Sequence, residues 1–186
     1  MNPCLPSVGN EEARLAIFLD YPAVVEDKRN KAWVSVNAEF VKWSLRRMSV
    51  DTDLVYFDFI LKCYPAMKLP GKKADRLALV AACSCYRYES LKTLQHCKTV
   101  VGLGSLAGEV LTGYGKIGEV EGCSWVPIER PLRDLGINVW IGYSPGYALE
   151  KPSESQGIYR VLWKAAEEAG LNPVFDPSVK PFPFPE

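Results

Sequence analysis

Four short loops hold the side chains best suited to chemistry, and each follows an apolar run. They are Asp20-Tyr21-Pro22-Ala23, Lys62-Cys63-Tyr64-Pro65, Gly104-Ser105 and Ser144-Pro145-Gly146. A carboxylate such as Asp20 can orient water or act as a general base, whereas Ser144 offers only a short neutral hydroxyl. In an open α/β sheet, ligands are met by the loops at the carboxyl ends of the strands. These loops are therefore the candidate site.

The elements that must position these loops are short strands separated by helical patterns. The strand candidates are Arg14–Leu19, Leu54–Leu61, Thr99–Leu103 and Ile137–Tyr143. Hydrophobic spacing predicts helices over Asn37–Arg47, Lys73–Leu94 and Ser105–Leu111, the last capped by Ser105. A final helix is predicted from a capping box of Ser153 and Gln156 to a stop at Gly170. Strands alternating with helices predict a parallel sheet covered on both faces.

Length and composition predict one domain, 1–186, with a Pro/Phe-rich extended tail over 177–186. The charges of the 22 basic and 22 acidic side chains cancel, so the overall charge does not indicate a nucleic-acid partner. This balance does not exclude a local basic patch. No apolar run approaches the ~20 residues of a membrane span, and the N-terminus lacks a signal-peptide pattern. We therefore expect a soluble, cytoplasmic protein that has no membrane partner.

Several motifs follow one another along the chain: the strand ending in Asp20-Tyr21-Pro22-Ala23, then Val55–Cys63, Val101–Ala107 and Tyr143-Ser144-Pro145-Gly146. Their order and spacing resemble the uracil-DNA glycosylase superfamily, closest to its iron–sulfur branch (family 4). The resemblance covers roughly residues 8–171. It implies a three-layer α/β/α sandwich with a central four-stranded, mostly parallel sheet.

The resemblance also implies a base-binding site, from which this chain departs at two positions. The family's histidine in the last loop is replaced by Ser144, which cannot carry positive charge beside a departing uracil anion. The family's asparagine that reads the pyrimidine edge is replaced by Phe59, while Trp33 stands where a phenylalanine stacks on the base. The implied substrate-binding residues are Tyr21, Pro22, Trp33, Phe59, Gly104, Ser105, Pro145 and Gly146.

Asp20 stands at the family's carboxylate and has two interpretations. It could orient water or support developing positive charge during glycosidic cleavage. It could equally be a turn- or helix-capping aspartate, as is common in Asp-x-Pro sequences. With the histidine and asparagine missing, we expect ordinary uracil excision to be lost.

The cysteines raise the question of a cofactor. In the iron–sulfur branch, four cysteines hold the cluster, and the matching positions here are Cys4, Cys63, Cys83 and, as a substitute fourth ligand, Cys85. Because two helical residues as close as Cys83 and Cys85 point apart, we favour a packing role and no cofactor. An iron–sulfur cluster is the alternative.

A basic loop with Lys68, Lys72, Lys73 and Arg76 is either a contact to the DNA backbone or a solvated surface turn. Three functions follow. The first is a DNA- or base-binding protein without ordinary uracil excision, similar to degenerate relatives found with bacteriophage replication polymerases. Its implied partners are single- or double-stranded DNA and a DNA polymerase, in a host cytoplasm if it is viral. The second is an active N-glycosylase of altered specificity that uses Asp20, and the third is a protein-interaction module.

Overall fold

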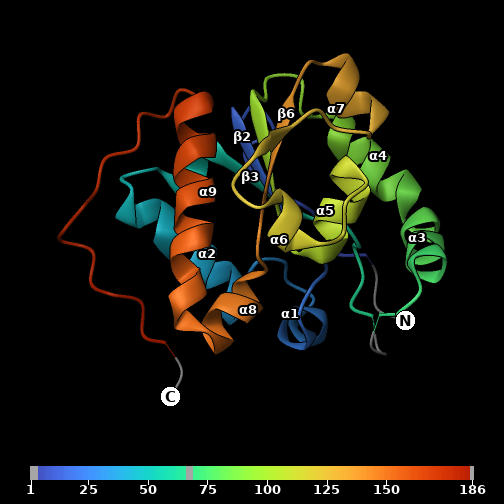
Figure 1. The fold of residues 1–186 in the computed structure, drawn as a ribbon, viewed down its shortest axis with the longest axis horizontal. Coiled ribbons are helices and arrows are strands. Elements are labelled where there is room, and N and C mark those ends of the chain that lie inside the picture. Colours follow the sequence, from blue (N-terminus) through green and yellow to red (C-terminus); the bar gives the residue numbers. More distant parts are fainter. Residues whose placement is uncertain (1–3, 66–68, 185–186) are drawn as a thin grey trace.

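The protein is an α/β fold whose sheet lies between two layers of helices (Figure 1). The computed structural model describes residues 4–65 and 69–184, without the side chains of 84–87. The sheet has the strand order β1-β3-β2-β4-β6-β5. The strands are β1 (Val8–Gly9), β2 (Leu15–Leu19), β3 (Val55–Phe59), β4 (Thr99–Leu103), β5 (Ser124–Trp125) and β6 (Asn138–Gly142).

The four predicted strands are the parallel centre of this sheet. β3, β2, β4 and β6 pair in parallel, whereas β1 and β5 pair antiparallel at the two edges. The prediction of the α/β class is confirmed, and the prediction of a four-stranded sheet is wrong because the described residues form a sheet of six strands. Each additional strand has two residues, too few to leave a hydrophobic alternation in the sequence.

Helices cover both faces of the sheet. They are α1 (Val24–Arg29), α2 (Val36–Arg47), α3 (Lys73–Ala82), α4 (Ser84–Lys92), α5 (Ser105–Thr112), α6 (Ile117–Val120), α7 (Arg130–Asp134), α8 (Pro145–Glu150) and α9 (Ser155–Glu168). α2, α8 and α9 pack on one face, and α3 to α7 pack on the other (Figure 1). Within the described residues, no helix combines the length and apolar character needed to cross a membrane.

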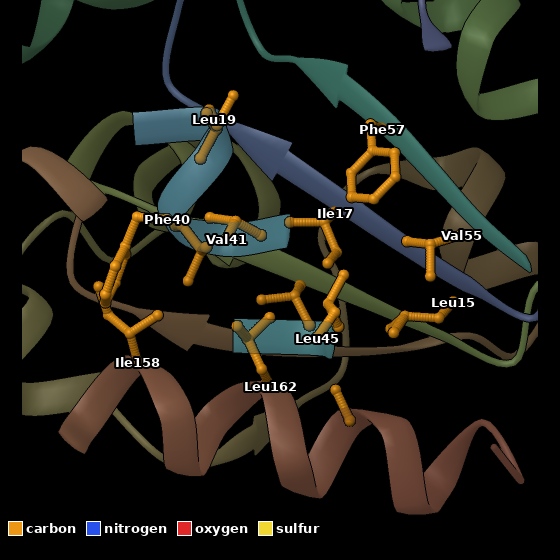
Figure 2. Packing of buried hydrophobic residues seen from close by; sticks show 14 of the residues in the cluster. Leu15, Ile17, Leu19, Phe40, Val41, Leu45, Val55, Phe57, Ile158 and Leu162 are labelled. Carbon is orange, nitrogen blue, oxygen red and sulfur yellow. The ribbon is translucent and has the colours of Figure 1, made fainter. Parts of the chain in front are cut away.

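Alternate residues of each strand build the two cores. Leu15, Ile17 and Leu19 of β2 point toward α2 and α9, where they meet residues such as Leu45 (Figure 2). Phe18, one residue out of phase, belongs to the core under α3 to α7. Because β2 is buried along its whole length, its sequence is a continuous apolar run, as expected for a central parallel strand.

Three helix boundaries differ from the predictions. The single helix expected over Lys73–Leu94 is broken at Cys83, whose ψ of 3° ends α3 before α4 begins. The predicted capping box of Ser153 and Gln156 does not form, because a 3₁₀ turn over Pro152–Glu154 precedes α9. Ser105 is the first residue of α5 and not its cap, because Gly104 occupies the cap position.

The tail after α9 is held against α2. Trp43 Nε1 donates to the carbonyl oxygen of Lys180 at 2.8 Å, and the amide of Val174 donates to the carbonyl oxygen of Met48 at 2.9 Å. The ring of Phe182 lies edge-on to the ring of Phe40, with centroids 5.1 Å apart. The tail therefore forms a strap along the outer side of α2 (Figure 1).

Candidate functional site

A pocket of about 370 Å³ lies at the carboxyl edge of the parallel strands. It is bounded by the ends of β2 and β4 and by the first turns of α2 and α8. This is where ligands bind in open α/β sheets. We call it the base pocket only because the resemblance implies a base-binding site at these loops. Its lining comprises Leu19, Asp20, Tyr21, Asn37, Leu103, Ser144, Pro145, Gly146, Tyr147 and Glu150.

Asp20 follows β2 directly, and its carboxylate lies at the N-terminus of α5. Its Oδ1 accepts a hydrogen bond from the amide of Ala107 at 2.8 Å, and the positive end of the helix dipole favours its charge. Gly104 makes this approach possible, since it has a φ of 130° and a Cβ built there would lie 2.3 Å from Asp20 Oδ1. Asp20 therefore binds the first turn of α5 and lines the pocket; this is not the local Asp-x-Pro cap of the second interpretation, and a catalytic role of Asp20 stays a prediction.

The protonation of Asp20 is shifted toward neutral pH. Burial raises the pKa of Asp20 to about 6, against the opposing effect of hydrogen bonds from the amides of Ala107 and Leu106. A group with a pKa near the working pH is present in both protonation states and can act as a general acid or base. The carboxylate is therefore both positioned and able to exchange a proton.

Ser144 caps α8, which begins where the sequence predicts only a tight turn. Its Oγ accepts a hydrogen bond from the amide of Tyr147 at 3.3 Å, and Pro145 occupies the first helical position. Capping uses the hydroxyl oxygen as an acceptor, so the hydroxyl hydrogen is what Ser144 can offer a ligand. Unlike the family's histidine, it supplies no positive charge.

Asn37 is the main polar residue that the sequence analysis missed. It stands in the first turn of α2, and a Cβ built on Gly146 would lie 3.6 Å from its Nδ2 and Oδ1. Ser35 caps this helix, and the buried carboxylate of Glu26 fixes its start by accepting from the amides of Val34 at 3.0 Å and Ser35 at 3.3 Å. The serine cap signals a helix start, but only the fold brings this start to the pocket.

Two residues predicted to contact a base lie in the core instead. Trp33 and Phe59 are fully buried and their ring centroids are 5.8 Å apart, so the prediction that Trp33 presents a stacking face is wrong for this conformation. The Trp33 indole Nε1 has no hydrogen-bond partner among the described residues, and its φ of 59° is unusual for a non-glycine residue. Pro22 does not line the pocket, and Ser105 is exposed at the start of α5.

Two cations of the basic loop, Arg76 and Lys73, make hydrogen bonds within the protein. Arg76 binds the buried carboxylate of Glu109 through Nε at 2.9 Å and Nη2 at 3.1 Å, and Lys73 Nζ donates to the carbonyl oxygen of Gly113 at 3.1 Å. These contacts contradict a primary role of Arg76 in binding phosphate. Lys72 is exposed at the start of α3, and Lys68 lies outside the described residues.

Three of the four predicted cluster cysteines lie together. Cys4 Sγ is 3.1 Å from Cys63 Sγ, and burial together with the thiols of Cys4 and Cys83 raises the pKa of Cys63 to about 12. The side chain of Cys85 is outside the described part of the structure. Among the described residues, no group of three or more His, Cys, Asp or Glu side chains has an arrangement that could hold a metal ion. The three thiols are half-buried, and Cys83 packs against the core under α3 to α7, which is compatible with the packing role.

The charge of the base pocket is negative. Its lining carries two carboxylates, Asp20 and Glu150, and contains no Lys, Arg or His from the described residues. A negative lining favours neutral or cationic groups and disfavours a leaving group that departs as an anion.

Comparison with known proteins found no matching protein-family model and no matching curated protein.

Proposed function

We propose that this protein binds a nucleobase of DNA in the base pocket, on a scaffold like that of uracil-DNA glycosylases, without ordinary uracil excision. The observation that carries the proposal is one pocket of about 370 Å³ that is lined by the oriented carboxylate of Asp20 and the amide of Asn37. An amide presents a donor and an acceptor together, which matches the edge of a base. The rings of Tyr21 and Tyr147 supply apolar cover.

The charge of the pocket explains why uracil is a poor substrate in this proposal. Uracil leaves as an anion, and its departure is favoured by a nearby positive group. Neither Ser144 nor any other described lining residue provides one. A base that is positively charged through N-alkylation leaves as a neutral molecule, so it does not need that group and is attracted by the carboxylates.

A second candidate function is N-glycosidic cleavage of such a base, and the environment of Asp20 favours it. In this reaction the oxygen of water bonds to the sugar C1′ and the bond from C1′ to the base nitrogen breaks. The departing base keeps the electron pair, and the proton of water passes to the Asp20 carboxylate. The hydrogen bond from Ala107 fixes the carboxylate, and a pKa of about 6 lets it accept the proton near neutral pH.

One set of oligonucleotides tests both candidates. End-labelled single-stranded and duplex DNA carrying uracil, 7-methylguanine or no modification is incubated with the protein, treated with alkali and examined for strand cleavage. We expect binding that weakens about tenfold in Asn37→Ala, the loss of one base-edge hydrogen-bonding group. Cleavage at 7-methylguanine that disappears in Asp20→Asn supports the second candidate, whereas rapid excision of uracil refutes the pocket-charge argument.

We further propose that Cys4, Cys63 and Cys83 have a packing role, and an iron–sulfur cluster on these three and Cys85 is the alternative. The closeness of Cys4 and Cys63 favours the alternative. Against it, burial raises the pKa of Cys63 and so disfavours the thiolate that a cluster needs, and no group of three or more such side chains among the described residues is arranged to hold a metal ion. A bound cluster would supply a cross-link between the N-terminal segment, the loop after β3 and the junction of α3 and α4. DNA, and a replication protein such as a DNA polymerase, are the partners that the resemblance suggests for a cytoplasmic accessory role. If the protein binds no DNA in the oligonucleotide test, a protein-interaction role takes its place.

A further inference from the structure

A second and larger pocket lies away from the base pocket, between α2, α9 and the C-terminal strap. Its volume is about 650 Å³. Three of its aromatic residues are Trp43, Tyr159 and Trp163. Its cationic residues are Arg47, Arg160 and Lys164. We call it the strap pocket.

The charge of the strap pocket is opposite to that of the base pocket. No Asp or Glu of the described residues lines it, whereas three cationic side chains do. Lys164 is paired with Glu167 at 2.9 Å, and the guanidinium of Arg47 donates to the carbonyl oxygen of Val179. Arg160 is exposed at the rim. The lining itself therefore carries cations and no carboxylate among the described residues, while Glu167 and Asp176 outside the lining offset part of the charge of Lys164 and Arg47; an anionic group suits the lining.

Aromatic rings give the pocket flat apolar surfaces. The rings of Tyr159 and Trp163, one turn apart on α9, have centroids 6.0 Å apart, and on α2 the rings of Phe40 and Trp43 are stacked at 5.9 Å. Such surfaces bind planar aromatic groups by stacking, and the binding free energy gained by stacking depends little on which base is bound.

Tyr159 combines a ring that lines the pocket with a hydroxyl that does not face solvent. This hydroxyl is buried and has no hydrogen-bond partner among the described residues, although Tyr159 lines the pocket. Because the hydroxyl is closed off from solvent, the ring of Tyr159 and not its hydroxyl is the surface that the pocket offers to a ligand.

The strap limits what can enter. Phe175 and Phe184 of the tail line the pocket, and the strap is tied to α2 by the hydrogen bond from Trp43 Nε1 to the carbonyl oxygen of Lys180. The ring of Phe175 also lies under the guanidinium of Arg47, 4.5 Å from its centroid. A pocket covered in this way suits a small ligand or a chain end and not a folded partner.

We propose that the strap pocket binds a nucleotide: its base would stack on Trp163 and Tyr159, and its phosphate would lie near Arg47 and Arg160. This site is independent of the base pocket and does not rest on the function proposed there. Free nucleotide and the phosphorylated end of single-stranded DNA present the same chemistry, and the test separates them.

The test is a titration followed by tryptophan fluorescence and calorimetry, with dTMP, thymidine, inorganic phosphate and a 5′-phosphorylated oligothymidine as probes. We expect dTMP to bind at least about tenfold more tightly than thymidine or phosphate alone, since stacking and charge both contribute. Trp163→Ala is expected to weaken dTMP binding about tenfold, and Arg160→Gln, a change at an exposed residue, to weaken it several-fold. Trp125→Phe, a change on the other side of the sheet, is the matched control.

The outcomes are distinct. Equal affinity for dTMP and the oligonucleotide assigns the pocket to a chain end, and preference for dTMP assigns it to free nucleotide. Unchanged affinity in both Trp163→Ala and Arg160→Gln overturns the proposal. Loss of dTMP binding in Asp20→Asn would also overturn it, because the ligand would then occupy the base pocket.

Discussion

Replacement of Asp20 by asparagine should change how the stability of the protein depends on pH. In the folded state Asp20 has a pKa of about 6, against an ordinary value of 3.8. Between these values the folded state binds more protons at this residue than the unfolded state. Stability therefore falls as the pH rises from about 4 to about 6, and the loss is complete above the folded pKa. Asparagine stays uncharged, so this part of the pH dependence disappears in Asp20→Asn.

The size of the effect follows from the two pKa values. The difference between a pKa of 3.8 and one of about 6 corresponds to about 3 kcal/mol in the free energy of unfolding, because one pKa unit is worth about 1.4 kcal/mol. Since Asp20 is only partly shielded from solvent at the base pocket, we expect about 2 kcal/mol. The asparagine Oδ1 can still accept from the amide of Ala107, so the α5 cap is retained.

The assay is urea unfolding of the wild-type protein and Asp20→Asn at closely spaced pH values from 4 to 8. The variant should gain about 2 kcal/mol relative to the wild type between pH 4 and 7. Asp53→Asn, a change at an exposed residue, is the control and should show a much smaller trend. A constant difference between wild type and Asp20→Asn across this range would refute the reasoning, because it would place the folded pKa near its ordinary value.

Three further predictions follow from single contacts. Protein purified without oxygen should be colourless and free of iron and acid-labile sulfide, as a packing role of the thiols requires; iron and sulfide that are lost in Cys63→Ser and kept in Cys123→Ser, a change at an exposed thiol, would establish the cluster instead. Arg76→Met should lower the free energy of unfolding by about 2 kcal/mol, because it leaves the buried carboxylate of Glu109 without its guanidinium; an unchanged urea midpoint would contradict this. Gly104→Ala should cost more than about 2 kcal/mol in the same assay, since its φ of 130° and the adjacent carboxylate leave no room for a Cβ.

The central strands could be predicted from the sequence because their signal is local. β2, β3 and β4 are runs of buried residues, and alternation with partly buried residues marks β6; β4 matches its predicted range, Thr99–Leu103, at both ends. The break at Cys83 escaped prediction because no Gly or Pro marks it in the sequence from α3 into α4. Two-residue edge strands have no period to detect.

Part of the base pocket could also be predicted, because the strands that carry two of its residues have a local signal in the sequence. Asp20 and Ser144 follow strands whose ends meet at one edge, so sheet topology alone places them together. The hydrogen bond from Ala107 to Asp20 spans 87 positions, and no local pattern indicates it. The position of Asn37 at the pocket and the burial of Trp33 likewise depend on how α2 packs, which is a tertiary effect.

The titration of Asp20 also separates binding from catalysis. Recognition of a neutral base through the Asn37 amide does not require Asp20 to be ionised, so its affinity should change by much less than tenfold between pH 5 and 8, although Asp20 titrates in the same pocket. Hydrolysis that uses Asp20 as a base needs the carboxylate ionised, so its rate should rise about tenfold per pH unit below pH 6 and level off above it. Single-turnover rates on 7-methylguanine DNA, measured beside equilibrium binding of unmodified DNA, test this. A flat rate profile with measurable cleavage would remove Asp20 from the reaction and leave it as the cap of α5.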